Sequence, residues 1–230
     1  MKKDEKHFDE WSKSYSGVTF VGPYFLNYLF RELIKEIKGE NFKILDLGTG
    51  DAKLLKAIAK VNPKNKFIGI DFSEGMLKQA KNNFNKGEFI KTSMEEKLPF
   101  KAKTINYVVS STAIHHVKNK DQLFSEIFRI LKENGKLLVI DQSDKEDLEY
   151  KKLKKRLKRE KPTFWKNYSK SFIKTERESI KELKKFKIKH PREYHLSPFS
   201  IKKKLESKGF SEVKIVPTPK FFVIYTATKK

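Results

Sequence analysis

Two strand–turn–helix units follow one another near the middle of this chain, and they constrain its fold more than any other feature. Residues 42–47 form a short apolar run that ends in Gly-Thr-Gly, and apolar residues then recur at helical spacing. Residues 66–71 repeat the pattern, and Ser73 is placed to cap the helix that follows. Three more predicted strands lie at residues 88–91, 105–110 and 136–141. Such alternation of strands and helices predicts a doubly wound, mostly parallel, Rossmann-like α/β sheet.

The two ends of the chain complete this arrangement. Residues 212–216 and 221–228 are two further predicted strands without a helix between them, so we expect an antiparallel hairpin at the edge of a seven-stranded sheet. A helix is predicted over residues 22–38, which carry apolar side chains on one face. Another is predicted over residues 197–208. Gly135 is expected to stop the helix that precedes the fifth strand.

The composition excludes several kinds of protein. There are no cysteines, which rules out disulfides, thiolate metal sites and cysteine nucleophiles. His7, His190 and His195 form no ligand spacing with one another or with paired carboxylates, so no metal is predicted. No apolar run reaches the roughly 18 residues of a membrane span, and residues 1–10 lack an apolar signal segment. The sequence therefore predicts a cytoplasmic protein without a membrane span.

The formal net charge of +23 is concentrated in one part of the chain. Residues 150–190 hold 17 Lys or Arg and 4 Asp or Glu, and Tyr150, Leu153 and Leu157 add a narrow apolar stripe on a helical wheel. Three interpretations stay open: a solvated helix, a platform for an acidic or nucleic-acid substrate, and an anchor on anionic lipid. The basic segment therefore allows a nucleic acid or an anionic surface as a partner.

The carboxyl ends of the parallel strands are the expected ligand site, because ligands of open α/β sheets bind there. Gly48 and Gly50 allow a tight turn and a close approach of the backbone to a ligand. Asp71 closes the second strand, where a carboxylate can accept both hydroxyls of a ribose. Lys53 stands where the dinucleotide fingerprint needs a third glycine, which disfavours a nicotinamide dehydrogenase.

Residues 8–141 resemble the class I S-adenosylmethionine-dependent methyltransferases. Residues 44–52 (ILDLGTGDA) are similar to the first motif of that family, with Ala52 in place of its final glycine. Residues 69–76 (GIDFSEGM) resemble the second motif. The resemblance implies a methyltransferase with S-adenosylmethionine as its cofactor.

Later segments resemble the small-molecule branch of the family, which includes quinone and sterol methyltransferases. Residues 91–100 (KTSMEEKLPF) look like the third motif, with Ser93 at a position where the family usually carries aspartate. Residues 107–116 (YVVSSTAIHH) and 129–140 (RILKENGKLLVI) complete the match. The resemblance therefore implies in-line transfer of a methyl group to a small-molecule acceptor.

The resemblance also implies which residues hold the cofactor. Asp71 would bind the ribose hydroxyls, and Phe72 and Met76 would lie against the adenine. The Met94 backbone or Glu95 would replace the missing aspartate beside the adenine amino group. The full expected set is Tyr15, Asp46, Gly48, Thr49, Gly50, Asp71, Phe72, Met76, Ser93, Met94 and Ser110.

Residues 8–15 (FDEWSKSY) resemble the N-terminal segment that folds over the cofactor in this family. Tyr15 would then face the methionine end of the cofactor. The alternative is ordinary packing by Phe8 and Trp11.

A single methyltransferase domain is predicted over residues 1–230, because 230 residues suffice for one such domain with an insertion. Its expected parts are an N-terminal helical cap (1–40), a cofactor-binding core (41–141), a basic helical insertion or lid (142–195), and a C-terminal helix with the hairpin (196–230). Four aromatic residues of the insertion could cover the substrate or form a small core of their own: Phe164, Trp165, Tyr168 and Phe172.

Methyl transfer from a sulfonium has a neutral leaving group, so alignment of the reactants and exclusion of water are the main requirements. An acceptor that carries a proton also needs a base. His115 or His116, after the fourth strand, is the candidate catalytic residue, and a packing role is the alternative for each. Asp141 and Asp144 are interpreted as a strand end and a helix cap.

Two other functions stay open from the sequence. One is methylation of RNA or protein, with the basic segment 150–190 binding the substrate. The other is a binding module that keeps the cofactor fold without catalysis and presents this segment to RNA or to a partner protein.

Overall fold

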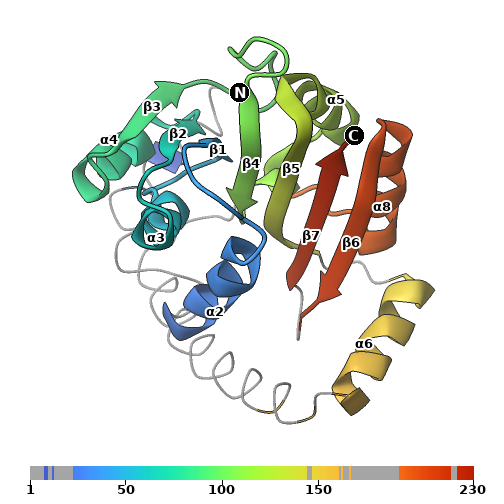
Figure 1. The fold of residues 1–230 in the computed structure, drawn as a ribbon. Helices are drawn as coiled ribbons and strands as arrows, with labels where there is room; N and C mark the ends of the chain where they lie inside the picture. Colours follow the sequence, from blue (N-terminus) through green and yellow to red (C-terminus); the bar gives the residue numbers. More distant parts are fainter. Residues whose placement is uncertain are drawn as a thin grey trace.

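The computed structural model describes residues 8, 9, 12, 23–143, 147–160, 162, 166, 192–218 and 222–230. A seven-stranded sheet with the order β3-β2-β1-β4-β5-β7-β6 forms its centre (Figure 1). The strands are β1 (Lys43–Leu47), β2 (Lys66–Asp71), β3 (Gly87–Lys91), β4 (Ile105–Ser111), β5 (Leu131–Gln142), β6 (Phe210–Pro217) and β7 (Phe222–Lys229). The helices are α2 (Pro23–Ile34), α3 (Lys53–Val61), α4 (Glu74–Asn83), the 3-10 turn η1 (Ile114–His116), α5 (Lys120–Ile130), α6 (Leu148–Glu160) and α8 (Pro198–Ser207).

The sheet changes from parallel to antiparallel at its C-terminal edge. β1 pairs in parallel with β2 and β4, β2 with β3, and β4 with β5. β7 is antiparallel to both of its neighbours, β5 and β6. The predicted seven-stranded fold with its antiparallel hairpin is therefore confirmed. The order of the strands reverses between β1 and β4, which is where ligands bind in open sheets.

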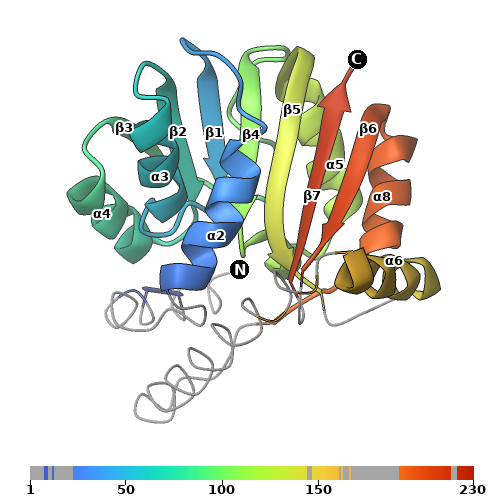
Figure 2. The same cartoon turned by 60° about the horizontal axis from the view of Figure 1, so that its bottom comes forward.

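Helices cover both faces of the sheet, because successive side chains of a strand point to opposite sides (Figure 2). On the face of α2, α3 and α4, Leu33 and Leu55 share a buried cluster with Ile44 of β1. On the opposite face, Phe124 of α5 belongs to the buried cluster of Leu45. Because its side chains alternate between the two faces, β1 packs against helices on both sides of the sheet.

The helix before β5 ends earlier than the sequence predicted. α5 ends at Ile130, and Leu131 is already extended and pairs with Ile105 of β4. Leu131 is fully buried, so strand pairing removes its side chain from water. Gly135 is not a helix stop. A Cβ at this position would lie 2.8 Å from the carbonyl oxygen of Lys132, which explains the glycine by close approach of the backbone.

The predicted insertion is described in part, through α6 and the returning segment 192–197. Its four aromatic residues, Phe164, Trp165, Tyr168 and Phe172, lie outside the described residues. Among the helices that are described, none is both long and apolar enough to cross a membrane.

Candidate functional site

The loop after β1 is a tight turn whose residues Gly48, Gly50 and Ala52 have positive φ angles of 66°, 53° and 62°. A Cβ at Gly48 would lie 2.4 Å from the Cβ of Ala113, so the loop packs directly against the segment after β4. A Cβ at Gly50, by contrast, would have no atom of the described residues within 4 Å. Ala52 keeps the left-handed conformation that suits the family's glycine at this position. The turn therefore leaves open space beside Gly50.

Asp71 ends β2 and points its carboxylate at this turn. Its Oδ2 accepts a hydrogen bond from the Gly50 backbone N–H at 3.0 Å, and its Oδ1 accepts one from Ser73 N–H at 3.0 Å. The Phe72 backbone N–H also interacts with this carboxylate. An ionised carboxylate has about four acceptor positions, so acceptor capacity remains for a ligand hydroxyl. Burial raises the pKa of Asp71 to about 6, against the lowering effect of its backbone hydrogen bonds. Asp71 is therefore largely ionised at neutral pH.

Asp46 lies beneath the same turn in a fully buried position. Thr49 Oγ1 donates to Asp46 Oδ2 at 2.8 Å, but Asp46 Oδ1 has no hydrogen-bond partner among the described residues. Burial raises the pKa of Asp46 to about 8, and the charges of Asp71 and Asp51 act in the same direction. Such a carboxyl group is largely protonated at neutral pH, and a cation brought next to it would favour its ionised form.

Ser110, predicted to approach the cofactor, donates its hydroxyl to the carbonyl oxygen of Leu47 at 2.8 Å. This bond ties the carboxyl ends of β4 and β1 together. Met94 lies against the glycine turn, since a Cβ at Gly48 would be 3.3 Å from its Cε atom. Ser93 Oγ accepts a hydrogen bond from the backbone of Glu95 at 3.1 Å and closes a local turn.

Residues 8, 9 and 12 bring the N-terminal segment onto this site. Asp9 Oδ1 accepts hydrogen bonds from Ser73 Oγ and from the Gly75 backbone N–H, at the N-terminus of α4. The Phe8 ring makes edge contacts with Phe72 at 5.1 Å and with His116 at 5.2 Å between ring centroids. Phe8 thus bridges the ends of β2 and β4. Tyr15 and Trp11 lie outside the described residues.

Ser73 and Met76 begin α4 as the sequence predicted. Ser73 Oγ accepts a hydrogen bond from the Met76 backbone N–H at 3.1 Å, so the predicted helix cap is confirmed. The Met76 side chain is 3% exposed and faces the interior at this edge of the sheet.

The two candidate histidines have different environments. His115 is buried, with Nδ1 2.6 Å from Asp141 Oδ1 and Nε2 3.7 Å from Glu193 Oε1. His116 is half-buried, and its Nδ1 lies 2.9 Å from the carbonyl oxygen of Arg192. Burial lowers the pKa of His116 to about 4, and the neighbouring His115 adds to this effect. A base step on His116 would therefore titrate near pH 4, below the neutral region expected for an ordinary histidine.

Sequence reasoning missed the carboxylates that face His115. Asp141 lies at the end of β5, as the sequence predicted, and β5 lies beside β4, so the ends of these two adjacent parallel strands meet at one edge. The adjacency of β4 and β5 could therefore have predicted that Asp141 lies near His115. Glu193 and His195 return to the site after the insertion, and no local pattern in the sequence marks them. Asp144, His7 and His190 lie outside the described residues.

The arrangement of turn, carboxylates and sheet has a counterpart in a known family. Residues 38–194 match the family model described as a methyltransferase domain. This chain belongs to that family. Methyltransferase domains of this type use S-adenosylmethionine, as the class I resemblance of the sequence implied.

A sequence relative supports this membership. The demethylmenaquinone methyltransferase of Listeria welshimeri is 28% identical over 150 residues, which cover 62% of this chain and 63% of that protein. The match thus spans less than two thirds of the relative's length.

Solved structures share the fold of this methyltransferase domain. A SAM-dependent methyltransferase from Aquifex aeolicus has a TM-score of 0.62 at 21% identity, covering 91% of this chain and 94% of its own. Human N-acetylserotonin methyltransferase in complex with SAM has a TM-score of 0.57 at 18% identity, covering 87% of this chain and 51% of its own.

Proposed function

We propose that this methyltransferase domain transfers a methyl group from S-adenosylmethionine to a small-molecule acceptor. The observation that carries the proposal is the buried Asp46 Oδ1, which lacks a hydrogen-bond partner among the described residues and lies beneath the glycine turn. S-adenosylmethionine supplies an electrophilic methyl group on a sulfonium and carries an ammonium. A buried carboxyl group without a partner suits such a cation.

The other residues of the turn have roles that fit the same cofactor. Asp71 has acceptor capacity for a ribose hydroxyl, and the open space at Gly50 lets a ligand approach the backbone. Phe72 and Met76 follow Asp71 at the position proposed for the adenine. Phe8 covers this edge and would help to exclude water. The chain's own contribution is therefore binding, alignment and protection of the reacting groups.

The name of the Listeria relative supports a small organic acceptor for this chain too, rather than RNA or protein. Isothermal titration with S-adenosylmethionine tests cofactor binding. Transfer of labelled methyl into a metabolite extract, with an RNA fraction in parallel, tests the acceptor class. Label in the RNA fraction alone would contradict the proposal, and absence of cofactor binding would favour a non-catalytic binding module.

Gly50→Ala is expected to weaken cofactor binding by at least about tenfold, because its methyl group enters the open space beside the turn. The left-handed conformation at this position costs alanine roughly 1 kcal/mol, so the melting temperature should fall by only about 2 to 4 °C. Titration calorimetry and thermal unfolding measure the two effects.

Gly209→Ala is the matched control, because Gly209 also has a positive φ, 94°, and lies between α8 and β6. It should lose stability without losing cofactor affinity. Parental affinity in Gly50→Ala would show that the cofactor does not approach this turn.

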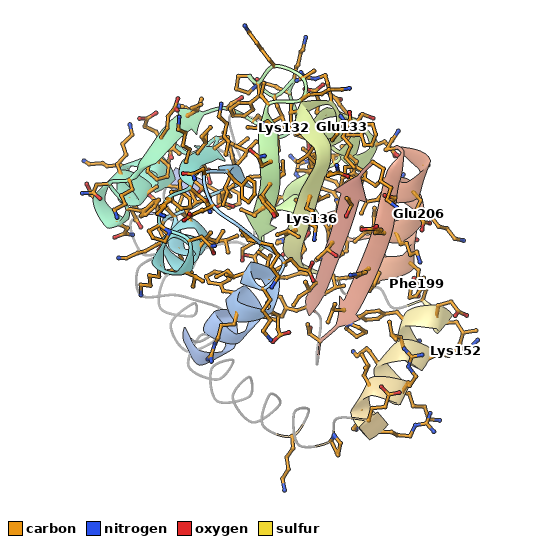
Figure 3. All side chains as sticks on the ribbon, in the orientation of Figure 1. Lys132, Glu133, Lys136, Lys152, Phe199 and Glu206 are labelled. Atoms are coloured by element: carbon orange, nitrogen blue, oxygen red, sulfur yellow. The ribbon has the colours of Figure 1, made fainter. Side chains whose placement is uncertain are left out.

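The basic helix α6 is the candidate contact for an anionic partner. Tyr150 Oη donates to the carbonyl oxygen of Phe222 at 3.1 Å, which fixes α6 beside the start of β7. Phe222 pairs with Gln142, so α6 lies near the carboxyl end of β5, at the edge of the sheet that carries the site. Lys152 lies on the outer side of α6 with 63% of its side chain exposed (Figure 3). We infer that α6 can present positive charge to an anionic surface or nucleic acid.

Neutralising four lysines of α6 to glutamine should leave cofactor affinity within about twofold, because none of them belongs to a cofactor motif: Lys151, Lys152, Lys154 and Lys155. Binding of the protein to anionic vesicles or RNA should fall, with a smaller salt dependence than in the parent. The control neutralises four exposed lysines of the α3–α4 face, Lys60, Lys64, Lys78 and Lys81. Equal binding and equal salt slopes in both variants would identify α6 as a solvated helix.

A further inference from the structure

Four ionisable side chains gather where the segment 192–197 returns to the sheet. Asp141 comes from β5 and His115 from η1, while Glu193 and His195 come from the returning segment. His115 lies between two carboxylates, 2.6 Å from Asp141 and 3.7 Å from Glu193. Glu193 Oε2 lies 2.7 Å from His195 Nε2. The four groups therefore form a chain of two close pairs, Asp141–His115 and Glu193–His195, which approach each other at 3.7 Å. The rings of His115 and His195 stack with centroids 5.5 Å apart.

Hydrogen-bond geometry indicates which ring nitrogens of His115 and His195 act as donors. His195 Nδ1 lies 3.1 Å from the carbonyl oxygen of Gln142, and its Nε2 faces the Glu193 carboxylate. Both partners are acceptors, so the two contacts are satisfied when both ring nitrogens carry protons. His115 donates through Nδ1 to Asp141 by the same reasoning, and its Nε2 faces Glu193. A proton on Glu193 therefore has His115 Nε2 as its neighbour in the chain.

Exposure varies along the chain of groups. The side chains of His115, Asp141 and His195 are 2%, 3% and 10% exposed, whereas that of Glu193 is 25% exposed. Glu193 is thus the most exposed of the four groups and the one that a bound molecule can reach. Asp141 is a buried carboxyl group beside an imidazole, and its negative charge would stabilise a positive charge on His115.

Other titratable groups face these four residues from the elements around them, namely His116, Lys120 and Tyr225. The His116 ring centroid is 4.0 Å from that of His115. Lys120 Nζ donates to the carbonyl oxygen of Tyr194, within the returning segment. Burial, together with the charge of Asp141, raises the pKa of Tyr225 well above its ordinary value. Tyr225 therefore stays neutral and does not compete for the proton.

A metal site is the other use of clustered histidines and carboxylates. Within the part of the chain that the structure describes, no group of three or more such residues has an arrangement that could hold a metal ion. Proton transfer is the chemistry that these contacts support.

We propose that Glu193 accepts the proton that the methyl acceptor loses and passes it to His115, whose imidazolium is stabilised by Asp141. This inference rests on the proposed methyl transfer. The acceptor's electron pair forms the bond to the methyl carbon, the carbon–sulfur bond breaks with its pair on sulfur, and the acceptor's proton goes to the Glu193 carboxylate. Glu193 is then the catalytic base, and His115 and Asp141 are positioning residues. The acceptor class is a molecule with a dissociable proton on its nucleophilic atom: a hydroxyl, a protonated amine or an acidic C–H.

Nitrogen-15 NMR of the imidazole rings tests the protonation pattern without any acceptor. In the parent we expect the His195 Nε2 resonance to report its contact with the Glu193 carboxylate at 2.7 Å. In Glu193→Gln we expect this resonance to shift, because the glutamine amide can donate to Nε2 whereas a carboxylate only accepts, and the shape of the side chain is kept. Identical His195 shifts in the parent and in this variant would overturn the proposal.

Kinetics with a 1,4-naphthohydroquinone as the probe acceptor tests the same step. Glu193→Gln should lower turnover by about 10²- to 10⁴-fold. Glu212→Gln, on the exposed edge strand β6, should keep parental turnover. A Glu193→Gln variant that turns over the probe at the parental rate would overturn the proposal.

Titration with S-adenosylmethionine separates this inference from the proposed function. A parent that does not bind the cofactor contradicts the proposed function itself. Binding in the parent together with unchanged His195 shifts in Glu193→Gln contradicts the proton transfer alone. If the parent does not methylate the probe, the NMR comparison decides.

Discussion

Asp71→Ala is expected to weaken S-adenosylmethionine binding by about 10- to 150-fold. Charge-assisted hydrogen bonds contribute roughly 1.5 to 3 kcal/mol, and each 1.4 kcal/mol changes an affinity about tenfold. The substitution removes the proposed contact with the ribose hydroxyls. It also removes the acceptor of the Gly50 N–H, which holds the glycine turn against β2. Titration calorimetry measures the loss.

The pH dependence of binding gives a second measurement on the same residue. Because the pKa of Asp71 is raised to about 6, its carboxylate is progressively protonated below that pH, and cofactor affinity should fall. In Asp71→Asn this part of the pH dependence should be absent. Asp121→Ala, at an exposed ion pair with Lys204 on α8, is the control and should bind normally. Unchanged affinity in Asp71→Ala, or tight binding of NAD, would contradict the cofactor assignment.

Cofactor binding at pH 7 is expected to release nearly one proton from Asp46. The pKa of this buried carboxyl group is raised to about 8, so it is largely protonated in the free protein. A cation beside Asp46 Oδ1 would lower that pKa and drive the proton off. Titration calorimetry in buffers with different ionisation enthalpies counts the released proton. Asp46→Asn should abolish the proton release and reduce the affinity for the cofactor. If the parent binds the cofactor without releasing a proton, the cation of the cofactor does not lie beside Asp46.

The stability of the free protein should change with pH for the same reason. Asp46 and Asp71 both have raised pKa values, about 8 and about 6, compared with 3.8 when unperturbed. Their stabilising contribution is fully present below pH 3.8 and is lost as pH rises through about 6 and then about 8. Urea unfolding should show that the free energy of unfolding falls less between pH 5 and pH 8 in Asp46→Asn than in the parent. A loss of the same size would mean that Asp46 does not carry the effect.

The sequence by itself determined the strand–turn–helix units and the edge at which ligands bind. Gly48, Gly50 and Asp71 lie within two consecutive units, and the geometry of each unit depends on hydrophobic spacing and turn residues over short distances. The carboxyl ends of parallel strands meet at one edge of the sheet. Local patterns were therefore sufficient to predict that these three residues lie close together. Their cofactor roles stay predictions.

Tertiary structure decided the contacts that join distant segments and the pKa values that depend on burial. Leu131 belongs to β5 and not to α5 because it pairs with Ile105 of β4. The helix signals of the local sequence contain no information about this competing strand pairing. The raised pKa of Asp46 comes first from burial, which only the packed core provides. Glu193 meets His115 across 78 positions of the chain, and no periodicity of the sequence extends over such a distance. Short-range chemistry therefore determined the sheet and its binding edge, whereas long-range packing decided which groups can exchange a proton there.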